Sequence, residues 1–328
     1  MALFWVFVLA VSILLYVLLD GFDLGVGILF GLTRGEARRE AMIGAVAPIW
    51  DGNETWLVAA GVVLWGAFPP VYATLLSAFY LPLLLMLAGL ILRGVAFEYR
   101  HQTRRGRWVW DASFAGGSLV AAFIQGVTVG AMVEGLPIVG GRYAGGDFGW
   151  LSPFAILCGV GLCLGYALLG AGWLAYKCEG ETREAAFRLI PRLAIALLIF
   201  LVAVFGYALM ENLRVLSRWL ERPYMFACPA IGAVAAVVLA ASIWKRWDGG
   251  PFYTVAAMFV AAFATLAISF WPYMIPFSVT IDQAAAPHSS LAFMFWGAGV
   301  FVFPLMLIYT AISYRVFRGK VAARPLHY

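Results

Sequence analysis

Apolar residues occur in long runs along most of this chain, and polar residues gather in the short connections between them. A helix needs about 20 apolar residues to cross a bilayer. Nine runs approach or exceed that length: 2–30, 50–68, 71–99, 111–132, 151–176, 187–212, 225–245, 251–271 and 291–316. We therefore predict an all-α polytopic membrane protein with about nine transmembrane helices, arranged as two four-helix bundles plus one peripheral helix.

The connections are too short for a soluble domain, so the chain 1–328 is predicted to be a single transmembrane helical domain. The longest connections, near 133–150 and 272–290, are rich in Gly and Pro. Pro82 and Pro304 lie inside predicted helices and predict kinks there. Small residues in the run 151–176 predict a close helix–helix contact: Gly159, Gly161, Gly165, Gly170 and Gly172.

Composition excludes several classes of protein. Of the 328 residues, 64% are hydrophobic and only 12% are charged, with a mean hydropathy of +0.91. Soluble domains carry about 25% charged residues, so a cytosolic enzyme, a disordered protein and a nucleic-acid-binding protein are all excluded. None of the four cysteines forms a C-x-x-C pair, which argues against an iron–sulfur or zinc-ribbon site.

The basic residues predict an orientation. Seventeen of the 22 Lys and Arg residues fall in the odd-numbered connections or in the C-terminal tail. Cytoplasmic connections are the ones enriched in Lys and Arg. The N-terminus is therefore predicted to face outside and the C-terminus to face the cytoplasm.

Four acids form the strongest candidate for chemistry. Asp20 and Asp23 lie at i, i+3 in the first run, and Asp51 and Glu54 repeat that spacing at the start of the second. A rise of about 1.5 Å per residue places all four, with Arg93, in the inner third of the membrane. Charged groups inside a bilayer are costly and usually functional. They could carry protons inward from the cytoplasm, or they could only cap a helix and pair with Arg93.

The histidines argue against a haem bound by this chain. Only His101, His288 and His327 are present, and none lies in the middle of a predicted helix. Haem iron in proteins is usually held by His, Met or Cys. Methionines in apolar helices more often fill gaps in the packing. We therefore expect no cofactor and no metal to be bound by this chain's own ligands.

Several motifs resemble those of a known family. The blocks are 21–25 (GFDLG), 47–57 (APIWDGNETWL), 68–72 (FPPVY) and 93–100 (RGVAFEYR), with a looser match at 271–276 (WPYMIP). Together they resemble subunit II of cytochrome bd-type quinol oxidases over nearly the whole chain. The short connections are similar to those of the cyanide-insensitive branch.

This resemblance implies the haem-free subunit of a respiratory terminal oxidase in the bacterial cytoplasmic membrane. The complex would oxidise quinol, reduce oxygen to water and take protons from the cytoplasm. Subunit I would be the partner and would hold two b-type haems, haem d and the quinol site. Membrane lipid and a small accessory subunit are further candidate partners, and no nucleic acid is expected.

The resemblance also implies roles for particular residues. It assigns proton delivery to Asp20, Asp23 and Asp51, and less securely to Glu54, whose position varies in the family. Arg93 and Glu98 are expected to be structural charge partners.

Two other functions remain open from the residues alone. A proton-coupled secondary transporter would also combine many helices with buried acids, but its site would lie at broken helices near the midplane. A scaffold subunit would use the acids only for folding and assembly. A haem-bearing partner that copurifies would separate an oxidase from a transporter, and proton uptake by assembled acid variants would separate a proton path from a scaffold.

Overall fold

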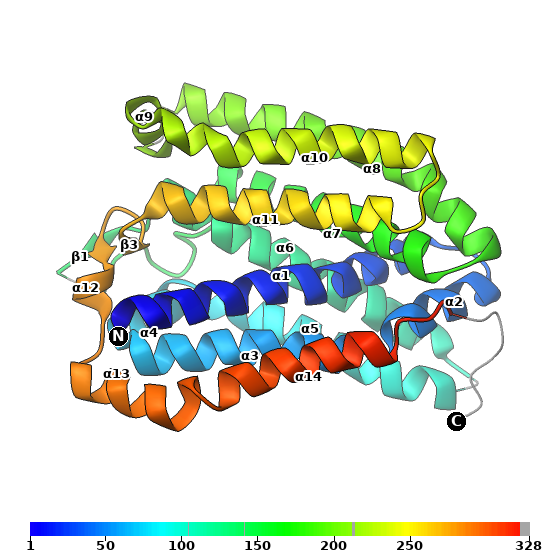
Figure 1. Cartoon of the computed structure of the whole chain (residues 1–328), viewed down its shortest axis with the longest axis horizontal. Coiled ribbons are helices and arrows are strands. Elements are labelled where there is room, and N and C mark those ends of the chain that lie inside the picture. The colour runs from blue at the N-terminus through cyan, green and yellow to red at the C-terminus, as the bar shows by residue number, and fades with distance from the viewer. Residues whose placement is uncertain (104, 141, 212–213, 322–328) are drawn as a thin grey trace.

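The computed structural model describes residues 1–103, 105–140, 142–211 and 214–321, and its long helices run side by side along the longest axis of the molecule (Figure 1). Within that part of the chain, eight helical segments are long and apolar enough to cross a membrane. They are α1 (Ala2–Leu32), α5 (Tyr80–Gln102), α6 (Arg107–Glu134), α7 (Pro153–Lys177), α8 (Gly180–Met210), η1 with α10 (Pro223–Trp244), α11 (Gly250–Phe270) and α13 to α14 (His288–Val316).

A further helix, α3 (Trp50–Ala67), packs along α1 in the same direction as the other long helices (Figure 1). Its 18 residues span about 27 Å. The acids at its start lower its hydropathy relative to the other spans. The prediction of an all-α membrane protein with about nine spans is therefore confirmed.

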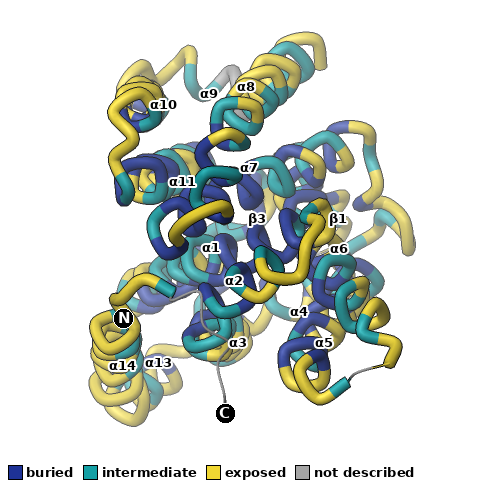
Figure 2. Tube along the Cα trace, turned by 90° about the vertical axis from the view of Figure 1, so that its right-hand side faces the viewer, coloured by how far each residue is buried: buried dark blue, intermediate teal, exposed yellow. Residues whose placement is uncertain are grey.

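The long helices form two groups. One contains α1, α3, α5 and α6, and the other contains α7, α8, α10 and α11, with α1 and α6 packed against α7. The outward surfaces of α8, α10 and α14 are exposed, while α7 and the second half of α1 are largely buried (Figure 2). The final helix, α14 (Val302–Val316), has no buried residue. It corresponds to the peripheral helix that the sequence predicts.

Both spans with an internal proline are interrupted near it, as predicted. The short helix α4 (Pro69–Ala78) ends just before Phe79, and α5 begins at Tyr80, two residues before Pro82. The last span consists of α13 (His288–Met294), the π-helical turn η2 (Phe295–Gly299) and α14. Pro304 has no N–H to donate to the carbonyl four residues earlier, which explains why the helix breaks at this point.

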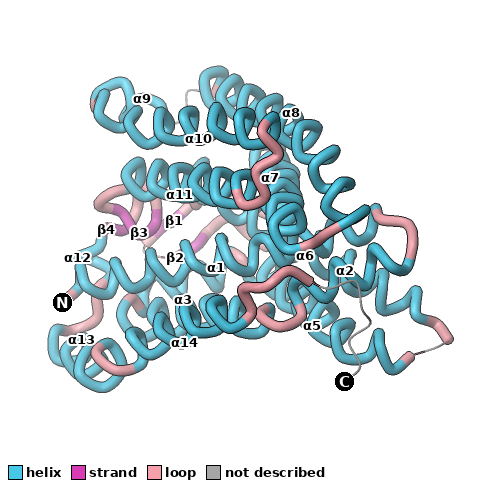
Figure 3. Tube along the Cα trace, turned by 45° about the vertical axis from the view of Figure 1, so that its right-hand side comes forward, coloured by secondary structure: helices cyan, strands magenta, loops and turns pink. Residues whose placement is uncertain are grey.

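The connections contain more structure than the apolar runs indicate. A helix, α2 (Glu36–Val46), joins α1 to α3 at one end of the molecule. Two antiparallel hairpins lie at the other end (Figure 3). The remaining elements are β1 (Ile138–Val139), β2 (Arg142–Tyr143), β3 (Tyr273–Ile275), β4 (Val279–Thr280), α9 (Arg214–Glu221), η1 (Pro223–Phe226), α10 (Ala227–Trp244) and α12 (Ile281–Ala284). We call these two ends the α2 end and the hairpin end.

Glycines allow α1 and α7 to pack backbone against backbone where the two groups meet. A Cβ atom on Gly25 would lie 1.8 Å from the carbonyl oxygen of Tyr166, and one on Gly170 would lie 2.6 Å from the backbone of Gly25. The Trp173 ring then stacks on Phe22 with ring centroids 4.2 Å apart. The predicted close contact of the 151–176 helix is therefore confirmed, and it fixes the part of α1 that carries the acids.

Candidate functional site

A buried arginine joins two of the four predicted acids. Arg93 on α5 donates from Nη1 to Asp20 Oδ1 at 2.6 Å and from Nη2 to Glu54 Oε2 at 3.0 Å. The Asp20 and Arg93 side chains are fully buried, whereas 26% of the Glu54 side chain is exposed. Through its contacts with buried Asp20 and partly exposed Glu54, Arg93 therefore connects the interior of the first helix group to its surface.

Asp23 is held by an amide. Asn53 Nδ2 donates to Asp23 Oδ2 at 2.7 Å, and Asn53 Oδ1 accepts from the Tyr314 hydroxyl at 2.9 Å. Asp23 and Asn53 are both buried. Because Tyr314 belongs to α14, this hydrogen-bonded chain ties the peripheral helix to the acids of α1.

Charge and hydrogen bonding are incompletely balanced in this cluster. Asp20, Asp23 and Glu54 are three carboxyl groups, and among the described residues Arg93 is the one cation that pairs with any of them, namely with Asp20 and Glu54. Asp20 Oδ2, Asp23 Oδ1 and Arg93 Nε are buried and make no hydrogen bond to a described residue. An uncompensated buried charge is costly, so such a cluster is suited to holding protons or water.

The fourth acid lies at the opening. Asp51 is exposed at the start of α3 and lines a surface cavity of about 460 Å³ with Glu54. The other walls come from α3 and α5: Trp50, Thr55, Val58, Leu90, Ile91, Gly94 and Val95. From Asp51 through Glu54 to Asp20, the carboxyl groups therefore pass from an exposed position to a fully buried one.

A second chain of polar groups ends at Tyr16, one helical turn before Asp20 on α1. Gln125 Nε2 on α6 donates to the Tyr16 oxygen at 2.8 Å, and the Tyr166 hydroxyl on α7 donates to Gln125 Oε1 at 2.8 Å. Tyr16 lies four residues before Asp20 on α1 and therefore shares its face. Tyr16 and Tyr166 are both buried.

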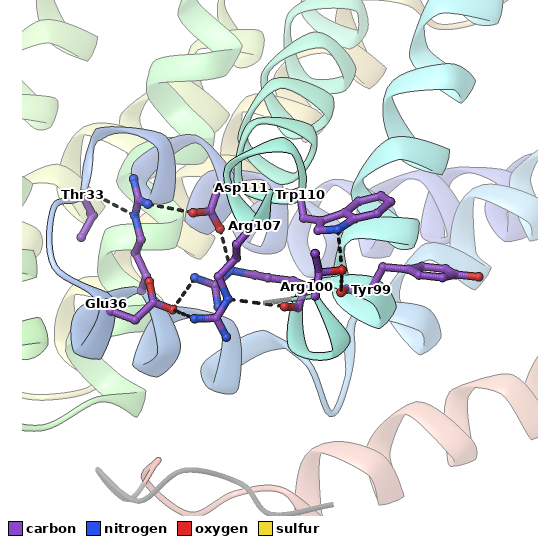
Figure 4. A network of polar contacts seen from close by, with 9 residues as sticks. Thr33, Glu36, Tyr99, Arg100, Arg107, Trp110 and Asp111 are labelled. Atoms are coloured by element: carbon purple, nitrogen blue, oxygen red, sulfur yellow. Dashed lines mark hydrogen bonds and ion pairs between the residues drawn. The ribbon is translucent and has the colours of Figure 1, made fainter. Parts of the chain in front are cut away.

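A separate ion-pair network lies at the α2 end (Figure 4). Arg100 is buried and donates to Asp111 Oδ1 at 2.6 Å and to Glu36 Oε1 at 2.7 Å. Arg39 reaches Asp111 at 2.8 Å, and Arg107 reaches Glu36 at 2.7 Å. This network fixes α2 against α5 and α6.

The structure places the remaining candidates at the surface. Glu98 is exposed on α5 and has no ion pair to another described residue, so of the two expected charge partners it is Arg93 that pairs with acids. His101 and His288 are exposed at the end of α5 and the start of α13. His327 lies outside the described residues. Among the described residues, no group of three His, Cys, Asp or Glu side chains could hold a metal ion.

Sequence reasoning missed the neutral residues of the site and one arginine. Spacing could have identified two of these. Arg100 follows Arg93 by two helical turns and so shares its face, and Tyr16 precedes Asp20 by one turn. Asn53, Gln125 and Tyr314 have no such signal, because an amide or a phenol in an apolar run is also a common packing residue.

Comparison with known proteins identifies the family. The family model for cytochrome bd terminal oxidase subunit II matches residues 1–317. A probable cytochrome oxidase subunit 2 of Haemophilus influenzae is 31% identical, with 98% of this chain and 95% of that protein covered. The cytochrome bd-I ubiquinol oxidase subunit 2 of Escherichia coli is 30% identical, with the same coverage.

A solved structure agrees with the fold. A chain of the bd oxidase from Geobacillus thermodenitrificans superposes with a TM-score of 0.79, at 16% sequence identity, with 97% of each chain covered. The long parallel helices are therefore an arrangement already observed in a bd oxidase. Taken with the family match over nearly the whole chain, this favours the oxidase over the transporter: the chain belongs to the cytochrome bd terminal oxidase subunit II family and is a multi-pass membrane subunit of a quinol-oxidising terminal oxidase.

Proposed function

We propose that this chain carries protons from the cytoplasm towards the oxygen-reducing centre of its partner, subunit I, through Asp51, Glu54, Asp20 and Asp23. The observation that carries the proposal is the graded burial of these acids around Arg93: Asp51 is exposed, Glu54 is half-buried, and Asp20 is fully buried. A proton relay needs carboxyl groups that can exist with and without a proton at moderate cost.

Arg93 gives the first transfer a defined geometry. It contacts one oxygen of Glu54 and one of Asp20, so both carboxyl groups are held at the same guanidinium. A proton that arrives on Glu54 weakens that ion pair and leaves Arg93 free to favour the ionised form of Asp20. We propose that water fills the gap beside Asp20 Oδ2 and Asp23 Oδ1, the two carboxyl oxygens that lack a hydrogen-bonding partner among the described residues.

The haems of the complex are proposed to lie in subunit I, as two b-type haems and one haem d. The histidines of this chain that the structure describes, His101 and His288, are exposed at helix ends and do not face the interior of a helix group. Haem chemistry would supply the electrons and bind the oxygen, while this chain's acids would supply protons. Lipid and a small accessory subunit are proposed as further partners of the exposed helices.

The direction of the path rests on orientation. We propose that the α2 end faces the cytoplasm and that the membrane is the bacterial inner membrane. The Arg-rich connection that contains α2 lies at that end, as does the end of α14. Lys and Arg mark cytoplasmic connections, so this orientation places the exposed Asp51 on the side from which protons are taken.

The test uses the assembled oxidase with Asp20→Asn, Asp51→Asn or Glu54→Gln. Each change keeps the shape of the side chain but removes the exchangeable proton. We expect quinol oxidase turnover and proton uptake to fall roughly 100-fold for Asp20→Asn and Asp51→Asn. Glu54→Gln should lower turnover and proton uptake less. In all three variants the haem content should stay near that of the wild type.

The control is Glu40→Gln, which neutralises an exposed acid on α2 at the same end of the molecule. Its turnover should match that of the wild type. If Asp20→Asn and Asp51→Asn both assemble with full haem and turn over at the wild-type rate, the acids serve only folding and assembly, and the scaffold interpretation replaces this one.

A further inference from the structure

Lys177 carries a buried ammonium group at the end of α7, and only 6% of the residue is exposed. Among the described residues, this group hydrogen-bonds two backbone carbonyl oxygens, those of Phe317 and Gly319, the second at 3.0 Å. Its nitrogen also lies 5.2 Å from the centroid of the Trp173 ring. A buried ammonium group without acceptors is costly, so the hydrogen bonds to the end of the chain compensate for the burial of Lys177.

The end of the chain docks on Lys177 in return. The Val321 N–H donates to the Lys177 carbonyl oxygen at 2.9 Å. The Val321 side chain packs towards α2, where a Cβ atom on Gly44 would lie 3.2 Å from its Cγ1 atom. We call Lys177 together with residues 317–321 the tail clamp. The tail clamp therefore joins the end of α14 to α7 and brings the end of the described chain next to α2 (Figure 1).

The last turn of α14 lies directly before the tail clamp. Because α14 has no buried residue, packing within this chain gives it little hold. Tyr314 lies three residues before Phe317, and its ring meets the Trp173 ring edge-on with centroids 6.1 Å apart. The Lys177 ammonium group contacts this same indole ring. Release of the tail clamp should therefore loosen the last turn of α14 and Tyr314 with it.

The Tyr314 hydroxyl reaches the acid cluster through one amide. It donates to Asn53 Oδ1 at 2.9 Å, and Asn53 Nδ2 donates to Asp23 Oδ2 at 2.7 Å. Because a donating hydroxyl needs an acceptor, this hydrogen bond keeps the amide oxygen towards α14 and the amide NH2 group towards α1. Among the described residues, no other side chain hydrogen-bonds the Asp23 carboxyl group. The placement of that carboxyl group therefore depends on Tyr314.

We infer that the tail clamp positions Asp23: it holds the last turn of α14 against α7, keeps the Tyr314 hydroxyl on Asn53 and so fixes the amide that binds the Asp23 carboxyl group. Lys177 and Tyr314 are thus positioning residues that act through Asn53. This inference deepens the proposed proton path and rests on it for any effect on turnover. The hold of the tail clamp on α14 does not depend on that path and is measured separately.

The first experiment is a double-mutant cycle on quinol oxidase turnover per haem in the assembled oxidase. Tyr314→Phe removes one hydrogen bond and should lower turnover roughly 5-fold. Lys177→Met removes the ammonium group but keeps an unbranched apolar side chain, and it should lower turnover by a smaller factor. Because Lys177 acts through Tyr314, the double variant should be no slower than Tyr314→Phe alone, whereas independent effects would multiply.

The second experiment measures amide hydrogen exchange of residues 311–316, the end of α14, in the same assembled proteins. Exchange should be at least several-fold faster in Lys177→Met than in the wild type. Lys177→Arg keeps a cation with several N–H donors, so it should restore both the slow exchange and most of the turnover. The matched control is Lys245→Met, at an exposed lysine at the end of α10, and it should leave both measurements unchanged.

The outcomes separate this inference from the proton path. Unchanged exchange in Lys177→Met, or effects of the two single variants that multiply, would overturn it. If Lys177→Met does not assemble, removal of residues 317–328 deletes the same contacts, and unchanged exchange at 311–316 overturns it instead. A slow Asp23→Asn beside a Tyr314→Phe with wild-type turnover would also overturn it. If Asp23→Asn itself turns over at the wild-type rate, the proposed path fails at Asp23, and exchange alone decides on the tail clamp.

Discussion

Arg93 is the residue on which the acid cluster depends. Both of its terminal nitrogens are used, one for Asp20 and one for Glu54, and its side chain has no exposed surface. Buried ion pairs add little net stability, but removing one partner leaves the other as an uncompensated buried charge. Within this cluster, removal of Arg93 should therefore lower the stability of the folded protein most.

Arg93→Gln is expected to destabilise the protein by about 3–5 kcal/mol, because Asp20 then remains buried without its cation. The double variant with Asp20→Asn should recover part of that loss, since it removes the stranded carboxylate. The yield of assembled oxidase and the midpoint of thermal unfolding measure both effects. If Arg93→Gln is as stable as the wild type, Asp20 is already protonated or hydrated and does not depend on Arg93.

The residues that the sequence predicted and those that it missed differ in kind. Charged side chains in an apolar run are conspicuous, so Asp20, Asp23, Glu54 and Arg93 could be identified without a structure. The hydrogen bonds of Tyr16 depend on the angle between helices that lie far apart in the chain, and no local pattern encodes that angle. Hydropathy therefore reveals charged members of a buried polar site more readily than neutral ones.

At the scale of elements, helix packing is tightest where α1 crosses α7 and loosest along α14. The crossing depends on Gly25 and Gly170, whose backbones leave no room for a side chain. By contrast, α14 has no buried residue and is tied to α3 by two polar contacts, Trp56 Nε1 to Thr310 Oγ1 at 3.2 Å and Tyr314 to Asn53. Substitutions where α1 crosses α7 should therefore lower stability much more than substitutions along α14.

Gly25→Ala should destabilise the protein by at least about 3 kcal/mol, because its Cβ atom would lie 1.8 Å from the carbonyl oxygen of Tyr166. The control is Gly206→Ala on α8, where a Cβ atom would meet nothing within 4 Å. Thermal unfolding of the purified protein compares the two. Equal midpoints would mean that α1 and α7 can separate at little cost.

The C-terminal tail is held in part by an ion pair, Lys320 with Asp248, whose strength depends on pH. Asp248 accepts from Lys320 at 2.8 Å and from Arg183 at 2.6 Å, and these hydrogen bonds lower the pKa of its carboxyl group. A carboxyl group with a lowered pKa stabilises the folded form above its ordinary pKa and loses that contribution as the pH falls. We expect the tail to loosen below about pH 4.

Asp248→Asn should loosen the tail at neutral pH as well. Amide hydrogen exchange at Val321, whose N–H donates to the Lys177 carbonyl oxygen at 2.9 Å, reports the change. Exchange at this amide, corrected for its intrinsic pH dependence, should be faster in the variant than in the wild type. Glu179→Gln, at an exposed acid near the same end, should leave it unchanged. Equal exchange rates in all three proteins would mean that the tail is held by its backbone hydrogen bond alone and not by Asp248.

For the whole molecule, hydropathy and proline positions predicted the long helices and the kinks, and one peripheral helix was expected without being assigned to a particular span. They could not predict α2 or the two hairpins, because these elements lie in connections that lack a long apolar run and resemble ordinary loops. They also could not predict that α3 and α5 meet through side chains across a cavity. Packing of this kind depends on long-range contacts, whereas span count depends on composition alone.

The orientation of the whole molecule is also testable. A reporter that is active only outside the cytoplasm should be inactive when fused after Tyr328 and active when inserted after Gly146, in the connection between α6 and α7 at the hairpin end. This pattern follows from the excess of Lys and Arg at the α2 end. The reverse pattern would place Asp51 on the outer side and reverse the direction of the proton path.

The contacts of Lys177 with the end of the chain can form only late in biosynthesis. Its ammonium group donates to the carbonyl oxygens of Phe317 and Gly319, residues that lie 140 and 142 positions later in the chain. At about 5–20 residues per second, a ribosome takes roughly 7–30 s to reach them. During that interval Lys177 lacks both of these carbonyl acceptors. Capture of the end of α14 by Lys177 is therefore one of the last steps of maturation, and a nascent chain halted before Phe317 would keep this lysine open to an amine-reactive label.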